Sequence, residues 1–203
     1  MSADAEPELG EGFVDAEVAA EFPELRLWTL PVPRGSGRTP PAVRDRLRRL
    51  SDRFRGAQAV ALRQRPVPWA YRVFFRHIGL DPDATRTPVE EAAMQRLIRG
   101  AFEATNLVDD ALLIALMETG VPLWALDAGA VAEPLGIALR DGRLAVVDQE
   151  GLVAPLFGAP EPRVGVTRQT ERTLLFAVQA PGVPAIFVEE AMWSCLGVLC
   201  GEG

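Results

Sequence analysis

Lysine is absent from this chain of 203 residues, and all 21 of its basic side chains are arginine. Enzymes that form a Schiff base on a lysine, pyridoxal enzymes among them, are therefore excluded. The phosphate-binding loop Gly-x-x-x-x-Gly-Lys is excluded as well, because its lysine supplies the charge that meets the β- and γ-phosphates. The chain is therefore no P-loop nucleotidase.

Histidine and cysteine are scarce, with one His and two Cys. Cys195 and Cys200 are expected on one helix and would point about 140° apart, so no disulfide is expected between them. Together with His77 they are too few for a tetrahedral zinc site, and we expect no metal and no cofactor. His77 lies in an amphipathic segment, which favours a packing or rim position over a catalytic one. No nucleophile with an adjacent base is found.

Long apolar runs are also missing, since none approaches the ~20 residues that cross a bilayer. The first dozen residues are acidic and polar, unlike a signal peptide. We therefore expect a cytoplasmic protein with no membrane partner. Residues 1–11 are expected to form a disordered acidic tail, and 12–203 a single domain.

The charge is distributed unevenly. Residues 34–99 hold fifteen Arg and six acidic residues, a net +9, whereas the blocks before and after carry −7 and −9. Such a basic block could contact RNA phosphates, or it could pair with the acidic flanks as a solvated face. Its centre is a predicted amphipathic helix over 42–54. The candidate phosphate contacts, off the apolar stripe of this segment, are Arg44, Arg48, Arg49 and Arg55.

The apolar period changes along the chain from helical to alternating. The first part predicts a short strand and helix over 13–22 and a strand over 25–32. Helices are then predicted over 42–54, over 68–79, after a capping box at Thr87 and over about 107–119. Later apolar runs, divided by Asp-Gly and Glu-Gly turns, predict several antiparallel strands before a last helix from Pro184. We expect an α+β fold, with helices packed on a mainly antiparallel sheet and helix 107–119 at its centre.

Polar residues within apolar segments are candidate sites, because an unsatisfied buried polar group costs about 1–3 kcal/mol. Asn106 is the only Asn and precedes helix 107–119, with Asp109 three residues later. This pattern is typical of a helix cap, and the alternative is a cradle for an anion or a polar ligand. Trp124 and Asp127 follow the helix, where the Trp either joins the core or forms the wall of a pocket for a ring-shaped ligand. The loop over 154–172 is rich in turns and charges and includes Glu161; such loops are mostly solvated but often carry binding residues.

Five segments stand in an order that resembles a known family. They are FVDAEVAAEFPELRL (13–27), WAYRVFFRHIGLDP (69–82), TNLVDDALLIALMETGVPLWALD (105–127), VVDQEGLVAPLFG (146–158) and VTRQTERTLLFAV (166–178). In this order, over about 13–200, the chain resembles the B3/B4 domain of the bacterial phenylalanyl-tRNA synthetase β-subunit, and more closely the free-standing B3/B4 proteins. The resemblance implies the α+β fold of that family. It also implies an editing activity, which in the synthetase hydrolyses tyrosine wrongly attached to the tRNA for phenylalanine, the second step of a double sieve.

The family's residues carry over in part. Its Asn and Asp at the helix start match Asn106 and Asp110, and its Asp after the helix matches Asp127. Trp124 stands where the synthetase has its editing histidine, and about Leu113 stands where it has an Asn within the helix. Its Phe-Gly-Gly-Glu resembles 157–161, with the Glu displaced to position 161. The resemblance therefore implies a pocket lined by Asn106, Asp110, Trp124, Asp127 and Glu161.

The leading hypothesis from the sequence is a stand-alone B3/B4-type protein that binds tRNA or aminoacyl-tRNA, with hydrolysis of a mischarged ester left open. No DNA partner is expected. The first alternative is a non-catalytic module of the same fold that binds a small aromatic or amino-acid-like ligand. The second is a protein that binds another protein.

Overall fold

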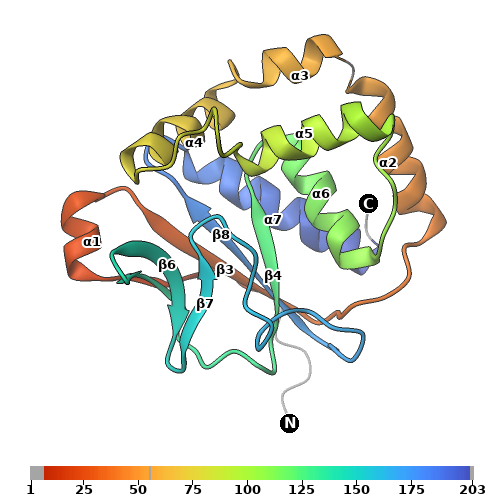
Figure 1. Ribbon diagram of the computed structural model, residues 1–203. Helices are drawn as coiled ribbons and strands as arrows, with labels where there is room; N and C mark the ends of the chain where they lie inside the picture. The colour runs from red at the N-terminus through yellow and green to blue at the C-terminus, as the bar shows by residue number, and fades with distance from the viewer. Residues whose placement is uncertain (1–6, 55, 202–203) are drawn as a thin grey trace.

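The computed structural model describes residues 7–54 and 56–201 and contains two sheets and seven helices in that part of the chain (Figure 1). The strands are β1 (Gly10–Glu11), β2 (Phe13–Val14), β3 (Arg26–Val32), β4 (Leu123–Asp127), β5 (Gly136–Arg140), β6 (Arg143–Asp148), β7 (Gly151–Pro155) and β8 (Thr173–Gln179). The helices are α1 (Ala16–Glu21), α2 (Pro41–Arg53), α3 (Gly56–Leu62), α4 (Pro66–His77), α5 (Pro88–Arg99), α6 (Leu107–Thr119) and α7 (Ala185–Cys200).

The first sheet has the strand order β1-β3-β8-β4, and all of its pairs are antiparallel. Its central strand β8 is buried along its first six residues, which is typical of a strand covered on both faces. Helices α6 and α7 lie side by side against this sheet (Figure 1). The sheet therefore separates the helical layer from the rest of the molecule.

The second sheet has the order β2-β5-β6-β7, with β2 and β5 parallel and the other pairs antiparallel. Ile137, Val146 and Val153 point from it into the main core, whereas Ala138 and Ala145 join a small cluster of their own. This alternation follows from the period of two in a strand. The expected α+β class is confirmed, but the single sheet is corrected to two, one of which contains a parallel pair.

Helix α6 lies at the centre of the helical layer, as its nearly all-apolar sequence predicts. Ala111, Ile114 and Ala115 have no exposed surface. Asn106 caps the helix at its start, and Gly120, at a φ of 83°, ends it in the left-handed conformation that favours glycine. The predicted capping box at Thr87 is also present, with the side chain of Glu90 accepting from the Thr87 backbone N–H.

Three boundaries differ from the expectations. Gly10 and Glu11 pair with β3, so the expected tail over 1–11 extends too far, and residues 1–6 lie outside the described part of the chain. Helix α4 begins at Pro66, two residues before the expected start. Helix α3 was not expected, because only Leu62 of its residues is buried and no apolar stripe marks it. Within the described ranges, no helix combines the length and the apolar character needed to cross a membrane.

Candidate functional site

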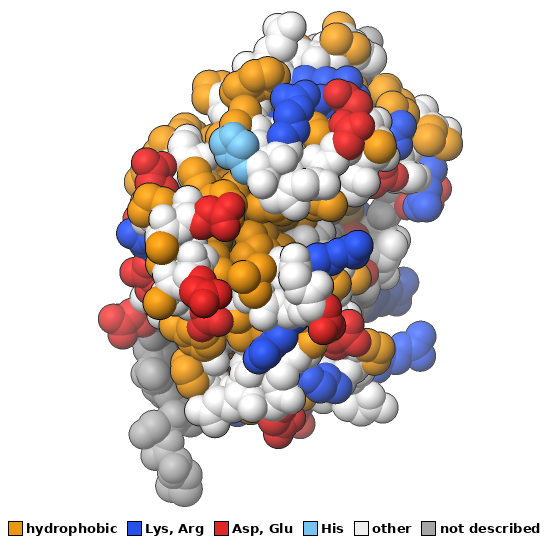
Figure 2. Space-filling model, turned by 60° about the vertical axis from the view of Figure 1, so that its left-hand side comes forward, with side chains coloured by type: hydrophobic (Ala, Val, Ile, Leu, Met, Phe, Trp, Pro, Cys, Tyr) orange, Lys and Arg blue, Asp and Glu red, His pale blue; other side chains and the backbone are white. Residues whose placement is uncertain are grey.

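A pocket of about 560 Å³ opens between α5, α6, β4 and the loop that follows β7. We call it the Trp124 pocket, and its lining residues are Arg86, Pro88, Glu91, Val108, Asp109, Leu112, Leu116, Pro122, Leu123, Trp124, Ala125, Phe157, Gly158, Ala159, Pro160, Gly165 and Val166. In Figure 2 the face turned forward is hollowed near its middle, with hydrophobic side chains at the bottom and charged ones of both signs around it. The pocket therefore combines an apolar interior with an ionic mouth.

Helix α6 forms one wall because its apolar residues also cover its outer face. Val108, Leu112 and Leu116 are spaced by four, which places them on one face of the helix. Leu112 and Leu116 remain partly exposed although they pack against the core. This apolar surface faces the pocket rather than another element.

Aromatic rings form the opposite wall. Trp124 stacks on Phe176 with ring centroids 5.3 Å apart and planes at 13°, and it lies 6.1 Å from the ring of Phe157. The Phe157 ring is held in turn against Tyr71 and Phe75. Trp124 is only half-buried, so it packs on the core with one side and lines the pocket with the other. Both sequence interpretations of this residue therefore describe part of its environment.

The turn at Phe157 is tight. Its φ of 62° is rare for a residue with a bulky side chain. The next residue is Gly158, where an added Cβ would approach the Pro155 Cβ to 2.9 Å. This strained backbone aims the Phe157 ring at Trp124, and strain of this kind concentrates at binding sites.

The mouth of the pocket carries one guanidinium and two carboxylates. Arg86 Nη1 lies 3.3 Å from Glu91 Oε2, and both side chains are more than two-fifths exposed. Asp109 is exposed at the first turn of α6, where its Oδ2 accepts from Asn106 Nδ2 at 2.6 Å. Asn106 Oδ1 accepts from the Asp109 backbone N–H at 3.0 Å, so Asn106 is the helix cap and orients the carboxylate that lines the pocket.

Three other predicted residues form hydrogen bonds to neighbouring segments. Asp110 is buried and accepts from the Thr105 backbone N–H at 3.0 Å and from the Thr39 hydroxyl. Asp127 accepts from the Thr170 hydroxyl at 2.7 Å and from a backbone N–H. Glu161 bonds Val153 through its backbone N–H at 2.7 Å. None of these three side chains lines the Trp124 pocket, and those of Asp110 and Asp127 hold neighbouring loop segments instead.

Sequence reasoning did not single out Arg86, Glu91, Leu112 or Phe157 as site residues. Leu112 could have been found from its spacing of four with its neighbours on α6, and Phe157 from the Gly that follows it. Arg86 and Glu91 flank an ordinary capping box, and nothing in the local sequence marks them as facing a pocket. His77 is exposed at the end of α4 and does not line the pocket.

Arg163 holds the loop that forms one wall of the pocket through ion pairs with Asp148 and Glu150. Arg163 Nη2 donates to Asp148 Oδ1 at 2.6 Å and also to the Leu152 carbonyl oxygen at 2.9 Å. Burial opposes ionisation of Asp148, but hydrogen bonds from Arg163 and from the backbone N–H groups of Ala132 and Glu150 outweigh it. They hold the pKa of Asp148 below its usual range.

Arg163→Gln is therefore expected to lower the free energy of unfolding by about 2 kcal/mol at pH 7, since Asp148 has no exposed side-chain surface. A lowered pKa contributes stability above the unfolded value of about 3.9, and this contribution disappears as the pH falls through the folded pKa. The difference between variant and parent should therefore shrink below about pH 4. Urea unfolding at pH 7 and pH 3 measures it, with exposed Arg168→Gln as the control. An equal loss at both pH values would contradict the assignment.

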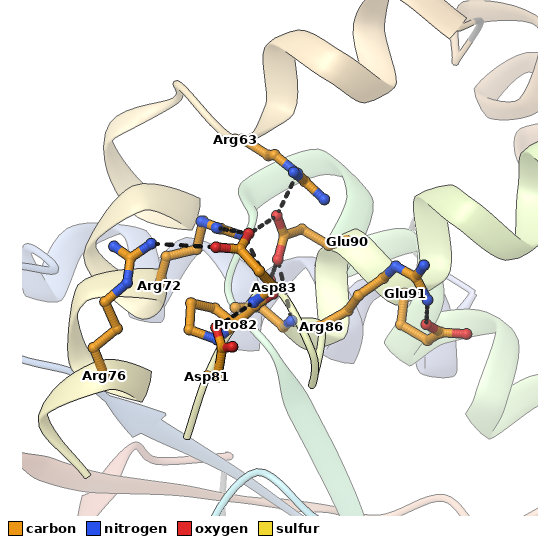
Figure 3. A network of polar contacts seen from close by, with 10 residues as sticks. Arg63, Arg72, Arg76, Asp81, Pro82, Asp83, Arg86, Glu90 and Glu91 are labelled. Atoms are coloured by element: carbon orange, nitrogen blue, oxygen red, sulfur yellow. Dashed lines mark hydrogen bonds and ion pairs between the residues drawn. The ribbon is translucent and has the colours of Figure 1, made fainter. Parts of the chain in front are cut away.

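The arginines of the basic block fall into two groups. Arg72 donates to Glu90 and Asp83, both at 2.6 Å, and Arg63 and Arg76 join the same network (Figure 3). Burial alone would lower the pKa of Arg72, but its bonds to the two carboxylates raise it. This part of the block is a folded ion network, but its acidic partners Asp83 and Glu90 belong to the block itself and not to the acidic flanks.

The predicted RNA contacts on α2 are placed differently. Arg44, Arg48 and Arg49 are all exposed, and Arg48 lies 3.0 Å from Asp45. Arg55 lies outside the described residues. Arg44 and Arg48 occupy one flank of the helix and Arg49 the other, so the predicted set does not form one surface.

The chemistry of the site must be read from its own residues. No model of a known protein family matches the chain, and no curated protein matches it. Among the described residues, no three His, Cys, Asp or Glu side chains are grouped so that they could hold a metal ion. The site defined by the structure is an apolar, aromatic pocket with charges of both signs at its mouth.

Proposed function

We propose that this chain is a stand-alone protein of the B3/B4 type, whose Trp124 pocket binds the amino-acid part of an aminoacyl-tRNA. The observation that carries the proposal is the combination of an aromatic interior with an ionic mouth. Trp124 and Phe157 offer ring surfaces to an apolar side chain, and the pocket volume of about 560 Å³ lies in the range of small-ligand sites.

The mouth fits the charged part of an amino acid. Asp109 and Glu91 present carboxylates that can accept hydrogen bonds from an ammonium group. Such charge-assisted hydrogen bonds are about twice as strong as those between neutral groups. In an aminoacyl ester the carboxyl is no longer charged, so the ammonium is the group to be recognised. The resemblance to the B3/B4 domain supports the location of the pocket, because Trp124 stands at a position of that family's editing site; the replacement of the editing histidine by Trp favours an aminoacyl group other than tyrosine.

A second candidate is a non-catalytic module that binds a free aromatic amino acid. It is favoured by the lining residues, which include no histidine, serine or cysteine that could act on an ester. Arg86 would then meet the free carboxylate, because a guanidinium matches a carboxylate with two parallel hydrogen bonds. The two candidate functions use the same pocket. They differ in the ligand's carboxyl group, which is esterified to tRNA in the first and is a free carboxylate in the second.

One experiment tests both. Thermal unfolding is followed with a panel of free amino acids and amino-acid methyl esters, and deacylation is followed with a panel of mischarged tRNAs. Stabilisation by an aromatic ester together with faster deacylation supports the first candidate, while stabilisation by the free amino acid without deacylation supports the second. A flat response to every ligand and ester would contradict both.

Leu112→Trp is expected to fill the pocket and to raise the Kd of any ligand found by this panel at least about tenfold. Leu112 is half-buried and faces the pocket, so the larger ring has room there and the midpoint of thermal unfolding should change little. Leu97→Trp, on an exposed position of α5 away from the lining, is the matched control. Unchanged affinity in Leu112→Trp would show that the ligand binds elsewhere.

A further inference from the structure

Three adjoining hollows follow α2, and they extend from Leu107 at the start of α6 to Glu118 near its end. They have volumes of about 410, 230 and 380 Å³. The first two share Arg46 and Arg49, and the last two share Leu50, Arg53 and Glu118, so they form one continuous groove. We call it the α2 groove, and the arginines that line it are Arg34, Arg46, Arg49, Arg53 and Arg65.

The sequence of α2 places its arginines there. Its buried residues include Val43, Leu47 and Leu50, which point into the core. At 100° per residue, Arg46, Arg49 and Arg53 fall within about 60° of one another on one flank of this apolar stripe. Arg44 and Arg48 lie about 100° or more away from all three, on the other flank. The helix therefore separates its basic residues into a groove set and a solvent set.

The groove keeps most of its positive charge. Two carboxylates line the groove beside its five arginines: Glu118 bonds Arg46 at 2.7 Å, and Asp45 pairs with Arg48, which lies outside the groove, at 3.0 Å. Arg34, Arg49, Arg53 and Arg65 form no ion pair with any residue that the structure describes. The guanidinium groups around Arg72, in contrast, are neutralised by Glu90 and Asp83. In a protein with a net charge of −7, this groove is a local positive surface that attracts an anionic partner.

The groove and the Trp124 pocket lie on different sides of α6. Val108, Leu112 and Leu116 of α6 line the pocket, whereas Met117 and Glu118 line the groove. The two sites are therefore separated by about the width of a helix, some 10 Å. A single partner that occupies both the Trp124 pocket and the α2 groove must be a large molecule. One part of it enters the pocket, and the part that lies in the groove carries many negative charges.

We propose that the α2 groove binds the phosphate backbone of an RNA. That this RNA is a tRNA rests on the proposed function. A row of guanidinium forks one turn apart suits a chain with regularly repeated anions, because each fork can bind a phosphate with two hydrogen bonds. The set of contacts differs from the one predicted from the sequence. Arg49 is retained, Arg44 and Arg48 are left out, and Arg34, Arg53 and Arg65 are added.

Fluorescence anisotropy with an unacylated tRNA transcript at several salt concentrations tests the groove. Arg49→Gln with Arg53→Gln removes two groove charges, and Arg44→Gln with Arg48→Gln removes two charges from the other flank of the same helix. All four side chains are exposed, so both variants should fold. We expect the groove variant to bind tRNA at least about tenfold more weakly. The slope of log affinity against log salt should become less steep by about 2, and the control variant should change little in both measurements.

Three results would overturn the proposal. The first is that the parent protein does not bind tRNA, and the second is that both variants lose the same amount of tRNA affinity. The third is that polyglutamate competes as strongly as RNA does, which would point to an acidic protein partner. The amino-acid panel is repeated with the groove variant to keep the two sites apart. Retained ligand stabilisation with lost tRNA binding assigns the defect to the groove. Retained tRNA binding with no ligand response in the parent would remove the proposed pocket function alone.

Discussion

Glu90→Ala is expected to lower the free energy of unfolding by about 3–5 kcal/mol, because it leaves the buried Arg72 guanidinium with only the exposed carboxylate of Asp83 as an ionic partner. Arg72 and Glu90 have only 5% and 3% of their side chains exposed, and their nearest atoms are 2.6 Å apart. The same carboxylate accepts from the Thr87 hydroxyl at 2.9 Å and completes the capping box of α5. The substitution therefore removes the ion pairs of Glu90 with Arg72 and Arg63 together with a helix cap.

Two further variants separate these contributions. Arg63 also contacts Glu90, but it is nearly half exposed, so Arg63→Gln should cost no more than about 1 kcal/mol. Arg72→Met combined with Glu90→Leu removes both buried charges and should be clearly more stable than Glu90→Ala, since no buried guanidinium is left with Asp83 as its only ionic partner. Urea unfolding measures all three. If the double variant is as unstable as Glu90→Ala, the loss of the buried carboxylate partner of Arg72 is not the cause of the lower stability.

Short-range signals predicted most of the helical part of the fold. The apolar run over 107–119, the Asn before it and the Gly after it predict α6 with both of its ends. Thr87, Pro88 and Glu90 predict the start of α5 in the same way. These predictions succeed because a helix is closed by hydrogen bonds between residues that are neighbours in the sequence.

Pairings between distant segments could not be predicted. β2 pairs in parallel with β5, more than a hundred residues later, and this contact divides the strands into two sheets. Arg72 and Glu90 come from two different helices, and their individual positions give no sign of a shared ion network. Such contacts depend on the global topology, which the local apolar period does not specify.

The candidate site shows the same division. Trp124 was predicted and lines the pocket, but Asp110 and Asp127 hold the surrounding segments instead. An acidic residue in an apolar segment must be satisfied when it is buried, and a backbone N–H satisfies it as well as a ligand does. The sequence alone does not distinguish a carboxylate that accepts from the backbone from one that binds a ligand. The adjacent residues Asp109 and Asp110 allow an experiment that separates these two roles.

Asp110→Ala is expected to lower the free energy of unfolding by about 3 kcal/mol while leaving the Trp124 pocket able to bind its ligand. The buried carboxylate joins three segments, since it accepts from Thr39 and Thr105 and lies on the first turn of α6. Its loss leaves the Thr105 backbone N–H and the Thr39 hydroxyl without their acceptor, at a cost of about 1–3 kcal/mol each. Urea unfolding measures the loss.

Asp109→Ala is the matched comparison, because it removes the neighbouring carboxylate from the same turn of the same helix. Asp109 is exposed, so the stability should fall by no more than about 1 kcal/mol. Its carboxylate lines the pocket, so the affinity for a ligand with an ammonium group should fall at least about tenfold. Stability and ligand affinity are thus expected to respond to different members of one Asp-Asp pair. The opposite result, with Asp110 controlling affinity and Asp109 controlling stability, would restore the site predicted from the sequence and contradict the one described by the structure.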